Sequence, residues 1–195
     1  MKKIVLITPF LQPYRITFYE KLSKVNEAYD LTVFHGLKSI EDGRPIYDGT
    51  TEFSNQGFQE FKFRILPYEF VYNKGMYSAI KRIDPDVVIM QAIAGNLTLR
   101  RILSWSSKRR KKIIIWVCGW EPERVKGVFL KIKNLFVATF LKKSDLFLTY
   151  STKASRYVQT MGIEASLIDT CYNGIEIDDM IKNEKTIIAQ SAEIR

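Results

Sequence analysis

Short apolar runs separated by helical patterns constrain the fold of this chain more than any other feature. The strongest run is residues 113–117, three isoleucines followed by Trp and Val, and residues 4–7 and 87–90 have the same character. A continuous β-rich run of four or five residues is typical of a strand buried on both faces of a parallel sheet. Residues 31–34 and 145–150 are two further expected strands.

Helical patterns fill the intervals between these strands. Apolar residues recur at helical spacing over 16–25 and 125–140, and shorter patterns cover 76–83 and 99–105. Strands and helices alternate about six times, which predicts an α/β fold: a Rossmann-like open, mostly parallel doubly wound sheet with helices on both faces. The expected helix ends are Asn96 or Thr98 and Ser151 or Thr152 as amino-terminal caps, and Gly162 as a stop.

Some stretches depart from this alternation. Residues 37–58 are polar and turn-rich, and we expect a long loop there. Residues 61–65 alternate between apolar and charged types, which predicts an exposed or edge strand. Residues 169–178 combine a short apolar strand, an Asn-Gly turn and an acidic run, and they predict the exit of a folded unit. We therefore expect one domain over residues 1–176, with a linker or the start of a further domain over residues 177–195.

Composition indicates a globular protein with an anionic partner. The apolar fraction of 46% and the aromatic fraction of 13% argue against disorder. The net charge of +9 favours nucleic acid, phosphorylated ligands or an acidic membrane surface without choosing among them. Cys118 and Cys171 lie in apolar runs, where buried thiols are common, and they suggest a reducing compartment and no metal site. No run approaches the length of a membrane span, and we expect a cytoplasmic protein.

Binding sites in such sheets lie at the carboxyl ends of the strands. The loop after the first strand carries Gln12, Tyr14 and Arg15 but no glycine-rich phosphate motif. An amide, a phenol and a guanidinium near the start of a helix suit hydroxyl groups or an anion. The alternative is a proline-shaped turn in which Tyr14 and Arg15 are ordinary surface or capping residues.

Other strand ends carry weaker candidates. Gly119, Trp120 and Glu121 follow the central strand and offer an aromatic platform beside a carboxylate, which suits a sugar ring. Alternatively, the Trp packs in the core and the Glu begins the next helix near its positive end. His35 is the only histidine, a possible general base, although a lone histidine is more often structural. The remaining polar candidates at strand ends are Gln91, Ser151, Asn173 and Gly174.

Two basic stretches suggest an anionic surface as a partner. A basic amphipathic helix can lie on an anionic membrane, but a solvated face opposite a core stripe gives the same pattern. Nucleic acid is the less favoured partner, because Trp105 is the only aromatic residue in the first stretch. The first stretch holds Arg100, Arg101, Lys108, Arg109, Arg110, Lys111 and Lys112, and the second holds Lys126, Lys131, Lys133, Lys142 and Lys143.

A series of loose motifs runs through nearly the whole chain in a fixed order. It comprises residues 4–10, Pro13-Tyr14-Arg15, residues 18–22, Pro85-Asp86-Val87-Val88, Ser144-Asp145, Ser151-Thr152-Lys153, Met161-Gly162 and residues 172–178. Their order and spacing resemble the N-terminal half of a GT-B glycosyltransferase, specifically the large retaining family 4. The last motif is similar to the Asn-Gly-hydrophobic-x-x-Asp signature that precedes the second domain of that family.

The resemblance implies two Rossmann-like domains facing each other across a cleft, of which this chain supplies the acceptor-binding half. The nucleotide-sugar donor would bind to the missing domain, and transfer would proceed with retention and without a metal or other cofactor. The first loop lacks the Gly-Gly pair of many relatives, and Cys118 to Trp120 replace their histidine, so no catalytic residue is assigned. The implied acceptor-binding residues are Gln12, Tyr14, Arg15, Gln91, Gly119, Trp120 and Glu121, with Ser151, Asn173 and Gly174 at the interdomain cleft.

The leading hypothesis is therefore the acceptor-binding half of a glycosyltransferase. It would move a sugar from a nucleotide-sugar to a saccharide or lipid-linked acceptor, peripherally at the inner membrane face, and would be inactive without its donor domain. The alternative is a non-catalytic docking module that recruits a separate donor-binding subunit to the membrane. A third and less favoured reading is a flavodoxin-like regulatory or nucleotide-binding domain.

Overall fold

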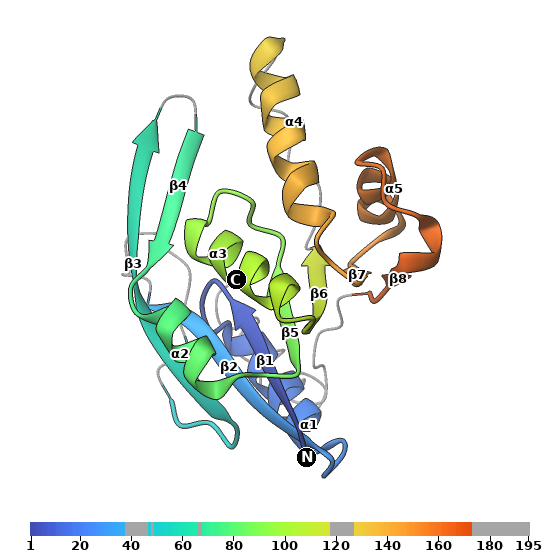
Figure 1. Ribbon diagram of the computed structural model, residues 1–195. Coiled ribbons are helices and arrows are strands. Elements are labelled where there is room, and N and C mark those ends of the chain that lie inside the picture. The colour runs from blue at the N-terminus through green and yellow to red at the C-terminus, as the bar shows by residue number, and fades with distance from the viewer. Residues whose placement is uncertain (38–46, 48, 66–67, 118–126, 173–195) are drawn as a thin grey trace, which may run out of the picture.

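The computed structural model describes residues 1–37, 47, 49–65, 68–117 and 127–172, and these build a single twisted sheet with helices on both faces (Figure 1). The strand order is β4-β3-β2-β1-β5-β6-β7-β8, and only the β3–β4 pair is antiparallel. The predicted α/β, mostly parallel, doubly wound fold is confirmed. The strands are β1 Lys2–Thr8, β2 Tyr29–Leu37, β3 Ser54–Ile65, β4 Tyr68–Asn73, β5 Val87–Gln91, β6 Lys112–Val117, β7 Leu146–Thr149 and β8 Ile168–Thr170.

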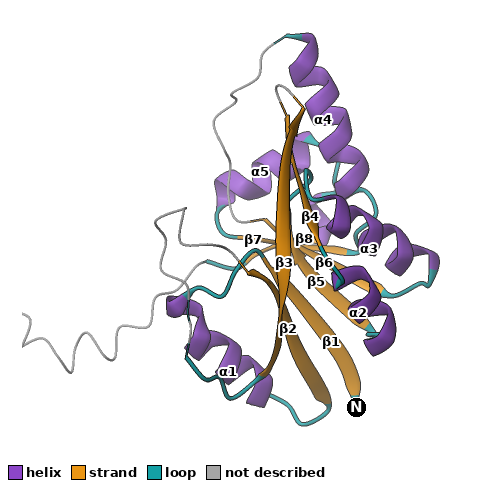
Figure 2. Cartoon of the chain, turned by 90° about the vertical axis from the view of Figure 1, so that its left-hand side faces the viewer, coloured by secondary structure: helices purple, strands orange, loops and turns teal. Residues whose placement is uncertain are grey.

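The helices divide unequally between the two faces of the sheet. Within the described residues, α1 (Ile16–Lys24) covers one face, and α2 and α3 cover the other (Figure 2). Helices α4 and α5 contribute side chains to the same core as α2 and α3. This asymmetry follows from the crossovers, because the chain moves one way from β1 to β2 and the other way from β5 to β8. The bounds of the other helices are α2 Met76–Ile83, α3 Leu97–Lys108, α4 Val128–Leu141 and α5 Thr152–Thr160.

Alternation along the buried strands decides which side chain enters which core. In β6, Ile113, Ile115 and Val117 point into the larger core beneath α2 and α3. Trp116 points the opposite way, into the smaller core beneath α1, together with Leu6 of β1. A run that is apolar at every position is therefore explained by burial on both faces.

For each of the two expected helix starts, the structure shows which of the two candidate residues forms the cap. The Asn96 side chain accepts a hydrogen bond from the Leu99 N–H at 3.1 Å and caps α3. The Ser151 hydroxyl accepts from the Ala154 N–H at 3.2 Å and caps α5. Gly162 follows α5 with φ of +82°, a left-handed conformation that glycine adopts without strain.

The predicted loop over residues 37–58 is wrong in its last part. β3 begins at Ser54 and runs for 12 residues, and β4 follows as an unforeseen hairpin partner. The first half of β3 pairs with β2, and the second half pairs with β4 beyond the edge of the main sheet. Ser54 and Asn55 are exposed and Gln56 is half-buried, so the usual apolar alternation of a strand is missing at this end of β3.

Cys171 also departs from expectation, because its side chain is exposed and not buried. It follows β8, a three-residue strand at the sheet edge, and its N–H donates to the Thr149 carbonyl at 2.8 Å. At the end of so short an edge strand, only the backbone is held by the sheet. Cys118 lies outside the described residues.

Candidate functional site

The carboxyl edge of the sheet has its topological switch point at β1, where the chain leaves toward β2 on one side and β5 lies on the other. Such a switch point is where ligands bind in open α/β sheets. The Gln91 side chain donates to the Thr8 hydroxyl at 3.5 Å, which joins the ends of β5 and β1. Both side chains are buried.

The loop after β1 is held against the end of β2 by a close backbone approach. The Gly36 N–H donates to the Pro9 carbonyl at 2.9 Å. A methyl group added at Gly36 would lie 2.5 Å from that carbonyl oxygen, so this approach requires glycine. The loop then continues into a 3₁₀ turn, Pro13–Arg15, whose amino-terminal cap is Gln12.

Arg15 ends this turn, and its side chain is only 5% exposed. Its guanidinium carbon lies 5.0 Å from the ring centre of Trp116, 5.3 Å from that of Tyr150 and 5.5 Å from that of Tyr14. One of its terminal nitrogens, Nη2, donates to the Tyr150 hydroxyl. Arg15 is thus enclosed by aromatic rings that come from β6, from the residue after β7 and from its own loop.

Several buried polar atoms of the first loop, α1 and β6 have no hydrogen-bond partner among the described residues. They are Nε and Nη1 of Arg15, the Tyr19 hydroxyl, Nε1 of Trp116 and Oε1 of Gln12. Tyr19 is fully buried, and it shares the small core with Trp116. Buried polar groups are nearly always hydrogen-bonded, because each orphan group costs about 1–3 kcal/mol. Only two other such side-chain atoms occur among the described residues, on Ser106 and Ser144.

The electrostatics keep Arg15 positively charged. Burial acts to lower the pKa of Arg15, but the hydroxyls of Tyr150, Tyr19 and Tyr14 outweigh it and raise the pKa above its ordinary value. Burial also raises the pKa of Tyr19, and the Arg15 charge offsets part of that effect. No carboxylate among the described residues pairs with this guanidinium.

The aromatic enclosure holds donor nitrogens without a partner on Arg15 and Trp116, and the Tyr19 hydroxyl interacts with Arg15. A buried cation with free N–H groups suits a phosphate or carboxylate, which accepts hydrogen bonds bidentately. The tyrosine and indole donors add bonds to further oxygens, and Oε1 of Gln12 can accept from a hydroxyl. The donor set therefore fits a polyhydroxylated ligand that carries an anionic group.

The structure brings some of the predicted site residues together and separates others. Tyr14 and Arg15 share the enclosure, and Gln12 precedes the same 3₁₀ turn with its Oε1 buried. Gln91 lies at the switch point beside Thr8. Ser151 caps α5 and holds the Ala154 N–H, which is a structural task. Whether these residues bind an acceptor stays a prediction. Gly119, Trp120, Glu121, Asn173 and Gly174 lie outside the described residues.

His35 lies in a structural setting. Its ring is buried in β2, with Nε2 3.3 Å from Oδ1 of Asn55 and Nδ1 3.3 Å from the Gly36 carbonyl. Among the described residues, no cluster of His, Cys, Asp and Glu could hold a metal ion. In the same part of the chain, no helix is both long and apolar enough to cross a membrane.

Sequence reasoning missed Trp116, Tyr150 and Tyr19 as site residues. Trp116 sits inside the strongest apolar run and reads as core, but strand alternation sets it opposite Ile115 and Val117. Tyr150 directly follows β7 in the structure, whereas the sequence pattern places it as the last residue of a strand over 145–150. Tyr19 carries no signal of a site, because it reads as an ordinary apolar-face residue of a helix.

No protein-family model and no curated protein sequence matches this chain. Solved structures do resemble it. HepE from Anabaena, in complex with UDP and glucose, superposes with a TM-score of 0.56 at 14% identity, over 91% of this chain and 46% of HepE. The lipopolysaccharide outer core galactosyltransferase WaaB matches with a TM-score of 0.51 at 14% identity, over 90% of this chain and 47% of WaaB.

A third match is the UDP-GlcNAc 2-epimerase from Neisseria meningitidis bound to UDP-GlcNAc. Its TM-score is 0.52 at 10% identity, and the match covers 99% of this chain and 52% of the epimerase. The chain therefore spans about half the length of each of these three proteins. At these identities the likeness establishes the fold, and the chain has the Rossmann-like architecture of one half of a GT-B-like protein.

Proposed function

We propose that this chain is the acceptor-binding, N-terminal half of a retaining glycosyltransferase of the family 4 type. It would hold a saccharide or lipid-linked acceptor while a nucleotide-sugar is held by a second, donor-binding domain. The fold shared with a galactosyltransferase and with a UDP- and glucose-bound protein supports this proposal, as does the coverage of 46–52% of those chains. The order of the sequence motifs favours a transferase over an epimerase.

The observation that carries the proposal is the buried Arg15 at the carboxyl edge of the sheet, two of whose nitrogen atoms have no hydrogen-bond partner among the described residues. The first loop lacks the glycine-rich sequence that lets a backbone cradle phosphates, so recognition here rests on side chains. Tyr14 is the exposed member of the enclosure and stacks on Arg15, which makes it the side chain that an entering ligand displaces.

In this proposal the chain contributes binding and orientation, not bond breaking. Arg15 anchors an anionic group of the acceptor, and the aromatic rings and Gln12 orient the sugar so that one hydroxyl faces the donor domain. Fixing the acceptor in this way lowers the entropic part of the transfer barrier. The departing nucleoside diphosphate is stabilised on the other domain, so the chain alone is expected to be inactive.

Calorimetry of the chain with glucuronic acid, glucose 1-phosphate and glucose tests the binding role. We expect the two anionic sugars to bind, and Arg15→Met to weaken them by about tenfold or more, because a charge-assisted hydrogen bond contributes about 1.5–3 kcal/mol. The matched control is Arg101→Met, an exposed arginine that stacks on Tyr77 at 4.2 Å on the other face. Its affinities should stay within about twofold of the original.

Two results would contradict the proposal. UDP that binds more tightly than pyrophosphate would show recognition of uracil and would place the nucleotide on this half. Conversion of UDP-N-acetylglucosamine without any acceptor would indicate an epimerase-like activity instead.

In the docking-module alternative, the donor-binding unit is a separate polypeptide and not a second domain of the same chain. The coverage of about half of each matched chain is consistent with a donor-binding unit on a separate polypeptide. Purification of the native protein followed by mass measurement distinguishes the two cases. A non-covalent complex with a second polypeptide, together with no sugar binding to this chain, would favour the docking module.

A further inference from the structure

The β3–β4 hairpin has one apolar face, and most of the side chains on that face are exposed. The paired residues are Phe61 with Tyr72, Phe63 with Phe70, and Ile65 with Tyr68. Residues directly opposite each other in an antiparallel pair point to the same face, so six aromatic or aliphatic side chains share one face of the hairpin. Phe61, Phe63, Ile65 and Tyr72 remain exposed, Ile65 by 62%.

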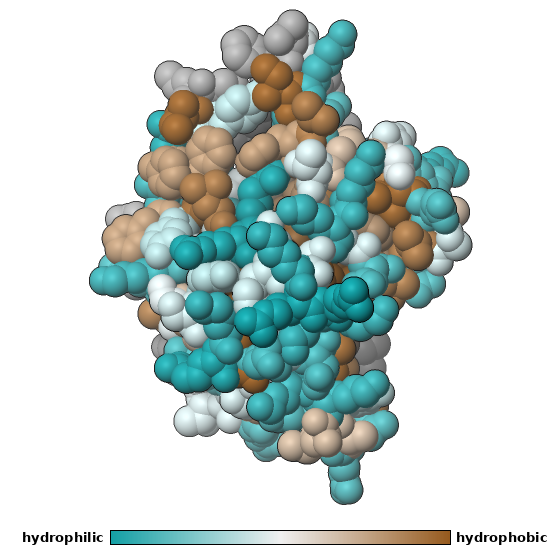
Figure 3. Space-filling view, in the orientation of Figure 1, coloured by the Kyte–Doolittle hydropathy of each residue, from teal (hydrophilic) through white to brown (hydrophobic). Residues whose placement is uncertain are grey.

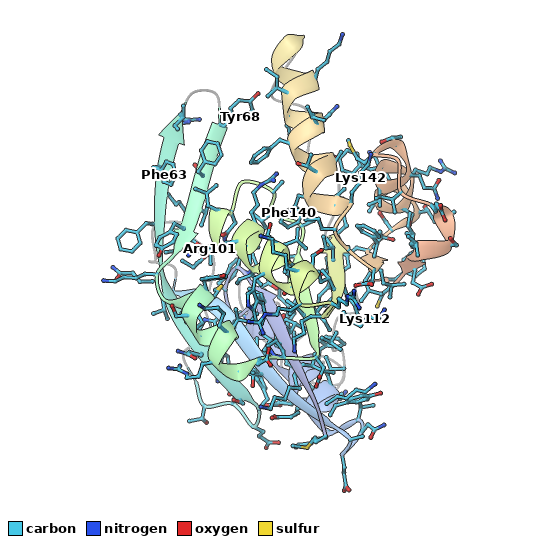
Figure 4. All side chains as sticks on the ribbon, in the orientation of Figure 1. Phe63, Tyr68, Arg101, Lys112, Phe140 and Lys142 are labelled. Carbon is cyan, nitrogen blue, oxygen red and sulfur yellow. The ribbon has the colours of Figure 1, made fainter. Side chains whose placement is uncertain are left out.

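Helix α4 continues this apolar face. Phe63 stacks on Phe70 with ring centres 5.6 Å apart, and Phe70 meets Phe136 of α4 edge to face at 6.3 Å. Ile132 and Leu135 lie on the same side of α4 as Phe136 by helical spacing and are 51% and 68% exposed. Figure 4 shows Phe63 on β3 and Tyr68 at the end of the hairpin nearest α4.

We name this region the hairpin–α4 surface. It projects beyond the body of the sheet, at the edge where β1, β5 and β6 end (Figure 1). Apolar side chains gather over its two elements, whereas the opposite end of the same view is mostly hydrophilic (Figure 3). Its members are Phe61, Phe63, Ile65, Phe70, Tyr72, Ile132, Leu135 and Phe136.

Basic side chains border this surface. Arg100 of α3 lies 3.2 Å from the ring centre of Phe136, and its guanidinium donates to the Ala94 carbonyl at 2.7 Å. Lys131 and Lys133 lie on α4, a helix whose sequence contains no acidic residue. On the hairpin, Lys62 and Arg64 alternate with the aromatic residues of β3, and Glu60 is already paired with Lys62 at 3.8 Å.

Exposed aromatic residues next to lysines favour a lipid bilayer over a protein or a nucleic acid as the partner. Lysine is depleted in protein interfaces relative to the rest of the surface, so an apolar face flanked by Lys131 and Lys133 fits a second protein or a second copy less well. Nucleic acid would leave the aliphatic side chains of α4 exposed to water. An anionic bilayer accommodates both groups, because aromatic and aliphatic side chains enter the interfacial region while lysines reach the headgroups.

We propose that the hairpin–α4 surface docks this chain onto an anionic phospholipid bilayer. Phe63 and Ile65 of the hairpin and Leu135 of α4 enter the interface, and Lys131 and Lys133 contact the headgroups. Docking goes beyond the proposed transferase function and does not depend on it. It would also bring the carboxyl edge of the sheet, where Arg15 lies, close to the membrane surface.

Vesicle co-sedimentation of the 195-residue chain tests the proposal, with phosphatidylcholine vesicles and with vesicles that also contain phosphatidylglycerol. We expect binding chiefly to the anionic vesicles. The double variant Ile132→Glu, Leu135→Glu should lower that binding by about tenfold or more, because both apolar contacts are lost and two like charges are added. Both positions are exposed, so the fold should be retained, which circular dichroism can verify.

Matched controls separate this surface from general hydrophobicity and charge. Val25→Glu introduces a carboxylate at a 69% exposed apolar residue after α1, and its binding should stay within about twofold of the original. Lys131→Gln with Lys133→Gln should weaken binding to anionic vesicles more than Lys108→Gln with Arg109→Gln, although both pairs remove two charges.

Three outcomes would overturn the proposal. The first is no sedimentation with either kind of vesicle. The second is equal vesicle binding by the Ile132→Glu, Leu135→Glu variant and the unmodified chain. The third is a dimer in analytical ultracentrifugation that the same variant dissociates while vesicle binding is absent, which would make the surface a contact between copies.

Discussion

Arg15 is a single buried residue whose hydrogen bonding differs from that of an ordinary core residue. It is buried, it stacks on aromatic rings, and two of its nitrogen atoms have no partner among the described residues. Burial of this charge opposes folding, and the three tyrosines around it offset that cost. The unpartnered nitrogen atoms of Arg15 are better explained by a ligand than by stability, since unfavourable local features are typical of functional sites.

The first prediction contrasts two buried or half-buried arginines. Arg15→Met should leave the free energy of unfolding unchanged or raise it by up to about 1 kcal/mol, because an incompletely paired buried charge is removed. Arg100→Met should lower it by about 1–2 kcal/mol, because Arg100 hydrogen-bonds the Ala94 and Phe136 carbonyls. Urea unfolding followed by circular dichroism measures both. A larger loss for Arg15→Met than for Arg100→Met would mean that Arg15 is structural.

The second prediction concerns pH and Tyr19. Burial raises the pKa of its hydroxyl in the folded chain above the unfolded value of about 10. The associated stability is fully present below that unfolded pKa and is lost as pH rises through the folded pKa, because the unfolded chain releases the proton first. Tyr19→Phe should therefore reduce the fall in unfolding free energy between about pH 9 and pH 11. Urea midpoints across this range measure it, and identical slopes would refute the assignment.

Among the helices and strands, the sequence predicts those that a local residue pattern determines. It fails to predict a strand that forms only by pairing with another strand. β6 and the caps at Asn96 and Ser151 were foreseeable from composition and spacing. The start of β3 was not, because its polar residues become a strand only by pairing with β2. In the same way, Arg15 was foreseeable from its place after β1, but Tyr150 stands 135 residues away and meets it only in the folded chain.

The third prediction compares the two caps. Asn96→Ala removes the α3 cap and also the bond from Nδ2 of Asn96 to Oδ1 of Asn73 at 2.8 Å, which leaves a buried amide oxygen unpaired. We expect a loss of about 2–3 kcal/mol in unfolding free energy. Ser151→Ala removes a single cap bond and should cost about 1 kcal/mol. Chemical denaturation distinguishes them, and equal losses would show that the bond between Asn96 and Asn73 contributes nothing.

At the scale of the whole molecule, the two proposed sites share one edge of the sheet but differ in chemistry. The Arg15 enclosure is buried, so its charge is little affected by salt, whereas the lysines beside the hairpin–α4 surface are at least partly open to solvent. The net charge of +9 adds long-range attraction to any anionic surface. Salt should therefore separate the two binding events even though neither depends on the other.

The fourth prediction follows from this difference in screening. Raising the salt concentration from about 0.05 to 0.5 M shortens the screening length from roughly 14 Å to 4 Å, and should weaken binding to anionic vesicles by at least about tenfold. Binding of glucose 1-phosphate should fall by only about two- to threefold, because its contact with Arg15 is enclosed. Vesicle sedimentation and calorimetry at matched salt concentrations measure the two effects. If the affinity for anionic vesicles does not change with salt, apolar insertion alone drives docking and the lysines do not contribute. Sugar binding as salt-sensitive as vesicle binding would instead place the anion on exposed lysines and not at Arg15.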